Sequence, residues 1–243
     1  MVEMSLLKEA KIWHYRDNII LSDFPESGRP DAVFPLCHEN LYFVDNFVIP
    51  ENSTVLDLCT GSGIIALFAA RKAKNVVAVD VNPRAIKFAK YNAELNGLID
   101  KIDFRLGNLF DPVKGMTFDV ITINPPFEPT PSEYINYLHS DGGEAGANIL
   151  KEIVAQASQY LLPNGSLQMI SYLRDDQLDI ISVLKHKFGD VHLKELGVIS
   201  AEAYNNYLAS RLFRLNPDKH LIFSNKLPIR YLYVKADGPR NEN

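Results

Sequence analysis

The sequence lacks the features that mark disulfide-rich, metal-binding or membrane proteins. Its 243 residues include two cysteines, Cys37 and Cys59, which are too few for a disulfide framework and whose spacing resembles no zinc motif. No stretch approaches the ~20 uninterrupted apolar residues of a membrane helix. Residues 1–13 carry charges that interrupt the apolar core of a signal peptide. We therefore expect a cytoplasmic protein with no membrane partner and no metal.

The sequence also lacks a basic excess. It has 25 Lys and Arg residues against 30 Asp and Glu residues, which gives a formal net charge of −5. Phosphate contacts supply much of a protein's affinity for nucleic acids. The acidic net charge therefore argues against a protein that binds RNA or DNA mainly through the phosphate backbone. The acidic net charge still allows a local basic patch, which Arg211, Arg214 and Lys219 could form.

From residue 53 onward, short apolar runs alternate with helical patterns. The runs predict strands over residues 53–58, 76–80, 102–106, 118–123, 166–172, 191–198 and 229–236. The helical patterns cover residues 64–72, 83–96, 145–162 and 177–188. This alternation predicts an α/β fold with right-handed crossovers, a doubly wound, Rossmann-like sheet of seven strands that is mostly parallel. Residues 199–227 are polar, mixed and interrupted by Pro217, so no full crossover helix is expected there and the last strand is predicted to be antiparallel.

Residues 1–52 have a less regular pattern and are punctuated by prolines. They predict a helix, an extended piece and a further helix around residues 39–47. We therefore expect an N-terminal extension, residues 1–52, that could serve as a lid or contact substrate, followed by a catalytic domain over residues 53–243.

A glycine-containing loop follows the first predicted strand. Gly61 and Gly63 allow a tight turn and close approach of a ligand. The helix that follows points its amide donors and the positive end of its dipole at the same place. Asp80 ends the next strand, 19 residues after Gly61, where an acidic side chain can accept the hydroxyls of a ribose. This loop predicts an adenosine-type ligand without separating S-adenosylmethionine from nicotinamide or flavin dinucleotides.

Longer stretches resemble the class I methyltransferases. Residues 55–63 resemble their motif I, and residues 77–85 resemble their motif II. Residues 107–111 are similar to the segment that contacts adenine in that family. The resemblance covers residues 35–172 and implies S-adenosyl-L-methionine as the cofactor. The residues that we predict to bind it are Asp57, Cys59, Thr60, Gly61, Gly63, Asp80, Val81, Asn108, Leu109 and Asn124.

Two of these residues depart from the family pattern. Cys59 stands where glycine is common, although Gly61 and Gly63 still permit the turn. Asn108 stands where an aspartate usually accepts a hydrogen bond from the adenine amino group, and its amide oxygen can still accept one.

The tetrapeptide Asn124-Pro125-Pro126-Phe127 follows the fourth predicted strand, at the sheet edge where doubly wound folds bind ligands. An NH₂ group conjugated to a carbonyl or a ring is a poor nucleophile, because its lone pair is delocalised. The Asn124 side-chain oxygen and the Pro125 carbonyl can accept its two N–H bonds. The prolines fix the backbone and add no competing donors, and Phe127 offers a flat face for stacking.

These four residues therefore predict catalysis by positioning, with no nucleophilic side chain. They resemble the signature of methyltransferases that act on amide or nucleobase nitrogens. The resemblance implies a planar nitrogen as methyl acceptor.

The acceptor itself stays open in the sequence. Residues 139–146 resemble a Gly-Gly loop of release-factor glutamine methyltransferases and predict either the start of a helix or a lid. His139 could be a general base, and His38 or Glu39 could contact a ligand or cap a helix. Phe127 in place of tyrosine, the stiff residues 128–131 and the short N-terminal region depart from those enzymes. The candidate acceptors are a protein glutamine amide, an RNA base amino group and a small-molecule nitrogen.

An NAD-dependent oxidoreductase, or another Rossmann cofactor-binding protein, is the alternative function. The glycine loop and Asp80 are equally compatible with such a protein. It would also need an acid or base for hydride transfer, and no such constellation stands out in the sequence.

Overall fold

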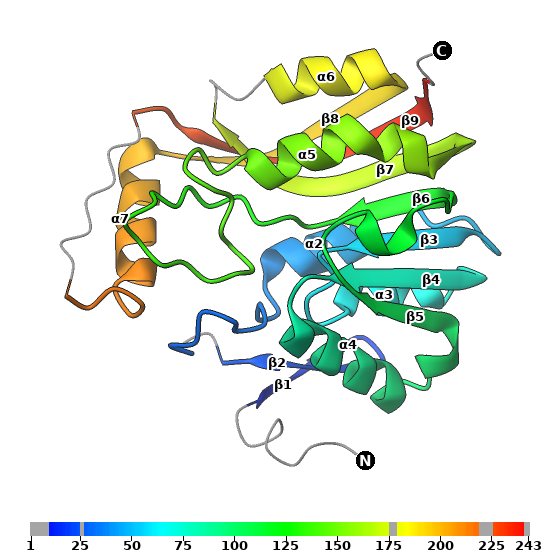
Figure 1. Ribbon diagram of the computed structural model, residues 1–243, viewed down its shortest axis with the longest axis horizontal. Helices are drawn as coiled ribbons and strands as arrows, with labels where there is room; N and C mark the ends of the chain where they lie inside the picture. Colours follow the sequence, from blue (N-terminus) through cyan, green and yellow to red (C-terminus); the bar gives the residue numbers. More distant parts are fainter. Residues whose placement is uncertain (1–9, 25–26, 175–178, 219–225, 241–243) are drawn as a thin grey trace. The chain divides into compact units, whose positions relative to one another are not determined.

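The computed structural model describes residues 10–24, 27–174, 179–218 and 226–240. The chain divides into two compact units (Figure 1). The first contains Met1–Ser27 and Asp31–Asn124, and the second contains Gly28–Pro30 and Pro125–Asn243. The division falls between Asn124 and Pro125, inside the predicted catalytic tetrapeptide.

The first unit is built on four parallel strands in the order β5-β4-β3-β6. They are β3 (Thr54–Leu58), β4 (Asn75–Asp80), β5 (Ile102–Leu106) and β6 (Phe118–Ile123). Helices α3 (Ile64–Ala70) and α4 (Pro83–Leu95) provide the crossovers, with the short turns η1 (Ile99–Lys101) and η2 (Asp111–Val113) nearby. The predicted strands and helices are confirmed here. Strands β3, β4 and β6 are mostly apolar and buried, as expected inside a parallel sheet, whereas β5 at the sheet edge alternates apolar and charged residues.

The two helices differ in how they are buried. All seven residues of α3 are buried, so this helix is apolar all round. Helix α4 has one buried face and starts with Asn82 as N-cap and Pro83 in its first turn. Helix α2 (His38–Asn46) agrees with the helix predicted around residues 39–47.

An antiparallel hairpin precedes α2, formed by β1 (Ala10–Tyr15) and β2 (Asn18–Asp23). The sequence pattern predicts a helix and an extended piece in this region. Residues 10–23 form the hairpin instead, while residues 1–9 lie outside the described part of the chain.

The hairpin is joined to α4 by two asparagines one helical turn apart. Asn92 accepts from the Leu21 N–H at 2.8 Å and donates to the Leu21 and Ser62 carbonyls, each at 2.8 Å. Asn96 makes the matching pair of bonds to Ile19, at 3.0 and 2.7 Å. Asn92 is fully buried, whereas the Asn96 contacts are exposed. These long-range bonds explain why the local sequence pattern does not reveal the hairpin.

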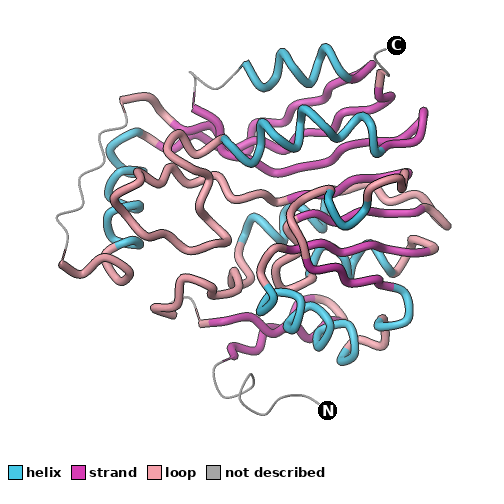
Figure 2. The backbone as a smooth tube through the Cα atoms, viewed as in Figure 1, coloured by secondary structure: helices cyan, strands magenta, loops and turns pink. Residues whose placement is uncertain are grey.

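The second unit contributes β7 (Leu161–Arg174), β8 (Phe188–Ile199) and β9 (Ile229–Pro239), in the order β7-β9-β8. Strand β9 runs antiparallel to both neighbours. The sheet therefore has seven strands and is mostly parallel with an antiparallel last strand, which confirms the predicted α/β, Rossmann-like class. Figure 2 distinguishes its strands from the helices and from the long loop after β6.

The helices of the second unit depart from the prediction at two places. Helix α5 (Asn148–Gln156), followed by η3 (Ala157–Tyr160), is shorter than the predicted 145–162, because Gly146 has a φ of +73° and β7 already starts at Leu161. Helix α6 (Asp179–Lys187) lies where a helix was predicted, and residues 175–178 lie outside the described part.

Helix α7 (Ala201–Leu212) was not expected in residues 199–227. Its side chains are mostly polar, so it lacks a broad apolar stripe. Its buried residues are Tyr204, Leu208 and Leu212, spaced four apart, and Ser200 caps its first turn. That spacing together with the cap is the sequence signal for this helix.

Within the described residues, no helix combines the length and apolarity that crossing a membrane requires.

The paired asparagines of α4 give a stability prediction. Replacing Asn92 by alanine leaves the Leu21 N–H and C=O buried without partners, so we expect a loss of about 2–4 kcal/mol in the free energy of unfolding. Asn96→Ala is the matched control, because water can replace its exposed contacts, and should cost less than about 1 kcal/mol. Urea unfolding followed by circular dichroism measures both. Equal losses would contradict the assigned role of burial.

Candidate functional site

Asp57, near the end of β3, is completely buried. Its Oδ2 accepts a hydrogen bond from the Thr60 hydroxyl at 2.6 Å, and its Oδ1 accepts one from the Thr122 hydroxyl at 2.9 Å. Burial raises the pKa of this carboxyl to about 7. Both oxygens are therefore occupied inside the protein, and the residue joins the predicted cofactor loop to β6.

The loop after β3 has an unusual backbone. Cys59, Gly61 and Gly63 have φ values of +54°, +55° and +82°, which is the left-handed region. A Cβ added at Gly63 would lie 2.9 Å from the Ala89 side chain of α4, so glycine permits close packing there. Burial raises the pKa of the Cys59 thiol well above its usual range, which keeps the group neutral. Cys59 and Cys37 are both free cysteines.

Asp80, at the end of β4, is fixed by the backbone on both sides. Its Oδ2 accepts from the Gly61 N–H and its Oδ1 from the Asn82 N–H, each at 2.8 Å. Burial raises the pKa of Asp80, and these N–H donors oppose that shift. The Val81 backbone also contributes a hydrogen bond to this carboxyl. A carboxylate has about four acceptor positions, so acceptor capacity remains for a hydroxyl of a ligand.

The other predicted cofactor residues follow β4 and β5. Val81 is 52% exposed, and Asn108 is also exposed. Leu109 is buried and has a φ of +41°. The Gly107 N–H donates to the Asp80 carbonyl at 3.0 Å, which connects the two segments. The first unit thus brings a fixed carboxylate, an exposed aliphatic side chain and an exposed amide to the carboxyl ends of adjacent strands.

Asn124 carries an unusual oxygen. Its Oδ1 is buried, and within the described part of the chain it has no hydrogen-bond partner. Leaving such a group unsatisfied costs about 1–3 kcal/mol, so it calls for an explanation. The oxygen can accept a hydrogen bond from an N–H donor.

Phe127 lies in the second unit at one end of a stack of three rings. Its ring stacks on Tyr172 with centroids 4.4 Å apart, and Tyr172 stacks on Tyr231 at 4.7 Å. Sequence reasoning missed Tyr172, although its place near the end of β7 was a usable signal. In the same unit Pro125 is buried, whereas Pro126 and Phe127 are partly exposed.

The predicted Gly-Gly loop pairs with the chain that follows the tetrapeptide. The Glu128 N–H donates to Ser140 at 2.8 Å, and the Gly142 N–H donates back to Glu128 at 2.9 Å. A Cβ added at Gly146 would lie 2.5 Å from the Phe127 carbonyl oxygen. Glycine at this position therefore lets the loop lie directly against the end of the tetrapeptide.

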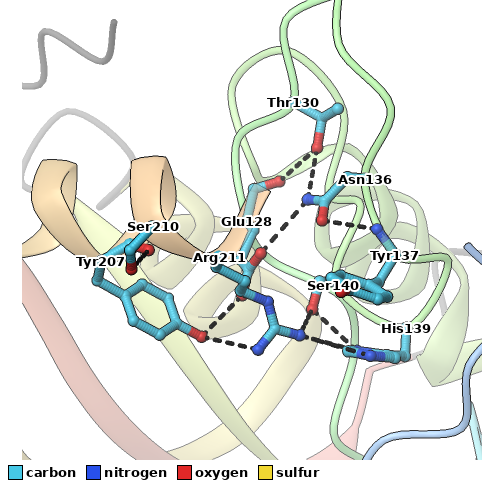
Figure 3. A network of polar contacts seen from close by, with 9 residues as sticks. All are labelled: Glu128, Thr130, Asn136, Tyr137, His139, Ser140, Tyr207, Ser210 and Arg211. Atoms are coloured by element: carbon cyan, nitrogen blue, oxygen red, sulfur yellow. Dashed lines mark hydrogen bonds and ion pairs between the residues drawn. The ribbon is translucent and has the colours of Figure 1, made fainter. Parts of the chain in front are cut away.

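His139 belongs to a polar network around Glu128 and Arg211 (Figure 3). Its ring stacks on Tyr137 at 5.3 Å, and the Arg211 Nη2 lies 3.4 Å from each ring nitrogen. Burial and the Arg211 charge hold the pKa of His139 well below its usual range, so the ring is neutral. Arg211 itself faces Glu128 in an ion pair at 3.2 Å. It is thus committed to this network, and Lys219 of the expected basic patch lies outside the described residues.

His38 and Glu39 occupy the first turn of α2. The cap of this helix is formed by Cys37 and Asn40, with the Asn40 Oδ1 accepting from the Cys37 N–H at 3.1 Å. Helix capping, one of the roles considered for His38 and Glu39, is thus carried out by their neighbours.

Neither a metal centre nor a hydride-transfer pair emerges from the described residues. No group of three or more His, Cys, Asp or Glu side chains there could hold a metal ion. Tyr231 and Lys235 have the Tyr-x-x-x-Lys spacing, but both lie on β9, where residues four apart are separated by about 13 Å. Lys235 instead pairs with Asp237 at 2.6 Å.

Known proteins resemble this chain in sequence and in fold. Residues 41–197 match the model of the methyltransferase small domain. A putative protein N5-glutamine methyltransferase of Methanocaldococcus jannaschii is 35% identical over 159 residues, which cover 63% of this chain and 79% of that protein. The release factor glutamine methyltransferase of Thermodesulfovibrio yellowstonii is 36% identical over 122 residues, covering 46% of this chain and 43% of that enzyme.

Among solved structures, the T. thermophilus 16S rRNA N2 G1207 methyltransferase, in complex with AdoMet and guanosine, has a similar fold. Its TM-score is 0.61 at 17% identity, over 94% of this chain and 50% of that one. The family match covers more than half of the chain, and no comparison supports the oxidoreductase alternative. The chain therefore belongs to the methyltransferase small domain family and is an S-adenosyl-L-methionine-dependent N-methyltransferase.

Proposed function

We propose that this enzyme methylates the side-chain amide of a glutamine in a protein. The buried, unpartnered Oδ1 of Asn124 is the observation that carries the proposal, because a primary amide supplies the N–H donor that this oxygen lacks. The names of the two relatives point to the same acceptor. The net charge of −5 and the pairing of Arg211 with Glu128 weigh against RNA. A cytoplasmic location is part of this proposal.

The residues of the first unit fit the cofactor. The remaining acceptor capacity of Asp80 would accept from the ribose hydroxyls, while Gly61 and Gly63 let the backbone approach the ligand. Val81, Asn108 and Leu109 would surround the adenine, with Cys59 and Thr60 completing the loop. Asp57 would act indirectly by supporting Thr60. When bound, the cofactor supplies an electrophilic methyl group on a sulfonium centre.

The tetrapeptide would orient the acceptor. The Asn124 Oδ1 and the Pro125 carbonyl would each accept one N–H of the glutamine amide. This arrangement would direct the nitrogen lone pair out of conjugation. Phe127, held by its stack on Tyr172, would cover one face of the planar amide. Catalysis then consists of orientation and exclusion of water. The division into an extension of residues 1–52 and a catalytic domain of residues 53–243 stays a functional proposal.

The acceptor class can be tested with tritium-labelled S-adenosylmethionine and a lysate from cells that lack this enzyme. We expect label in material that protease releases and nuclease leaves intact, recovered as N-methylated glutamine after digestion. Label that is released by nuclease would overturn the glutamine proposal in favour of an RNA base.

Replacing Asp80 by alanine tests the cofactor site. The loss of charge-assisted hydrogen bonds should weaken S-adenosylhomocysteine binding by about 1–3 kcal/mol, measured by calorimetry. Asp103→Ala is the control, since this carboxylate is exposed on β5 and pairs only with Arg105 among the described ion pairs. An unchanged dissociation constant for Asp80→Ala would remove Asp80 from the site.

Replacing Asn124 by alanine separates function from stability. Single-turnover methyl transfer to a glutamine peptide should fall at least ~100-fold, the scale of a lost positioning group, with cofactor affinity nearly unchanged. The free energy of unfolding should stay equal or rise, because the variant removes a buried, unsatisfied oxygen. Asn124→Asp keeps an acceptor and should be milder. Wild-type transfer by Asn124→Ala would contradict the planar-nitrogen mechanism.

Asp57 gives a prediction about pH. Its pKa of about 7 in the folded, cofactor-free chain lies above the ~3.9 of an unfolded aspartate. The stability that its raised pKa provides is therefore complete below about pH 4 and is lost as pH rises to about 7. Compared with Asp57→Asn, the wild type should lose free energy of unfolding across this window. Parallel curves of stability against pH for the two proteins would show that Asp57 is ionised throughout.

A further inference from the structure

The residue directly after the tetrapeptide is a buried acid. Glu128 follows Phe127 and is only 3% exposed. A buried carboxylate is unfavourable unless partners surround it. The side chains of Arg211, Asn136, Tyr207 and Ser140 do so. Its Oε1 lies 3.2 Å from the Arg211 Nε and accepts from the Tyr207 hydroxyl at 3.1 Å, and its Oε2 accepts from Asn136 at 3.3 Å.

Arg211 extends from α7 and reaches both sides of the loop (Figure 3). Besides facing Glu128, it donates from Nη2 to the Ser140 hydroxyl at 2.8 Å and from Nη1 to the Tyr207 hydroxyl at 3.2 Å. Its guanidinium also lies 5.1 Å from the centre of the Tyr137 ring. A planar guanidinium with several donors suits this role, since it can hold several groups in one fixed arrangement.

The side chains joined by Arg211 are also joined through their backbones. Glu128 and Ser140 share a backbone hydrogen bond at 2.8 Å, and Glu128 accepts another from Gly142. The loop formed in this way ends at Gly146, directly against the Phe127 carbonyl. Movement at Glu128 would thus be transmitted to Phe127 over a single peptide bond.

A buried ion pair adds little stability over apolar side chains of the same size, but losing one partner is costly. Its position beside a catalytic motif therefore points to control of geometry. Burial raises the pKa of Glu128 while Arg211 lowers it, so the arginine favours the charged form of the acid.

We propose that Arg211 is a positioning residue for methyl transfer, which fixes Phe127 through the carboxylate of Glu128. Helix α7, which carries Arg211, would thereby support the reaction. The sequence alone assigned no function to this region. The inference rests on the proposed function, in which Phe127 covers the acceptor amide.

The test uses the full chain and four variants, Arg211→Met, Arg211→Lys, Glu128→Gln and the double variant Glu128→Gln/Arg211→Met. The double variant removes both charges, so it keeps the test valid if Arg211→Met alone fails to fold. Arg230→Met is the matched control, since Arg230 faces Glu195 at 2.7 Å in an exposed ion pair of the same unit.

We expect Arg211→Met and the double variant to lower single-turnover transfer to a glutamine peptide at least ~10-fold, because small displacements of reacting groups are costly. The dissociation constant of S-adenosylhomocysteine should change less than about twofold. Arg211→Lys should recover part of the rate, since it keeps the charge. The melting temperature of the double variant should return toward that of the wild type while its rate stays low. A merely structural role would predict that rate and stability recover together.

Hydrogen exchange gives a second readout that needs no acceptor. The backbone amides of Glu128 and Gly142 should exchange at least ~10-fold faster in Arg211→Met and in the double variant, but not in Arg230→Met. Unchanged exchange, or a wild-type transfer rate in either folded variant, would overturn the proposal. If the wild type fails to methylate the glutamine peptide, the proposed function fails, and hydrogen exchange alone then decides the role of Arg211.

Discussion

The first unit depends on one buried carboxylate. Asp57 lies on β3, between β4 and β6, and holds the hydroxyls of Thr60 and Thr122. The loop after β3 passes through left-handed backbone at Cys59, Gly61 and Gly63, so it leaves the regular strand pattern. Side-chain bonds from Asp57 and Asp80 add to the few backbone bonds that hold it. Because Thr122 lies two residues before Asn124, Asp57 connects the predicted cofactor loop with the strand that leads to the tetrapeptide.

In the second unit, a buried acid is held by a residue of opposite charge. Glu128 is only 3% exposed, and the cation Arg211 lies beside it in an ion pair. The hydrogen-bond partners of Asp57 are the Thr60 and Thr122 hydroxyls and the Ala66 backbone, none of which is charged, so burial dominates and raises its pKa to about 7. The two acids stand on either side of the tetrapeptide in the sequence. One stabilises the chain that enters the motif, and the other stabilises the chain that leaves it.

The elements that could be predicted from the sequence are those determined by neighbouring residues. Strands β3, β4 and β6 are mostly apolar and buried, and Asn82 with Pro83 marks the start of α4, so these elements can be predicted from neighbouring residues alone. The hairpin of β1 and β2 depends on Asn92, which is 71 residues from the Leu21 backbone that it binds. Helix α7 buries one narrow row of side chains, too few to dominate its polar composition.

The same distinction applies to the candidate site. The motif residues Gly61, Asp80 and Asn124 could be chosen from the sequence, because their spacing and chemistry are local. The residues that hold these motif residues in place could not be chosen from the sequence. Tyr172 reaches Phe127 from another strand, and Arg211 comes from a helix 71 residues after Ser140, to which it donates. Sequence motifs therefore suggest candidate site residues, while the residues that hold them in place become visible only in three dimensions.

The position of β9 has a consequence for how the chain acquires its structure. This strand follows β7 and β8 in the sequence but lies between them in the sheet. During synthesis the ribosome releases β7 and β8 before their shared partner exists. Their unpaired edges stay available to other chains until residues 229–239 emerge. Strand pairing across so long a separation is slow. We therefore expect the second unit to be prone to association with other chains until β9 has paired with both strands.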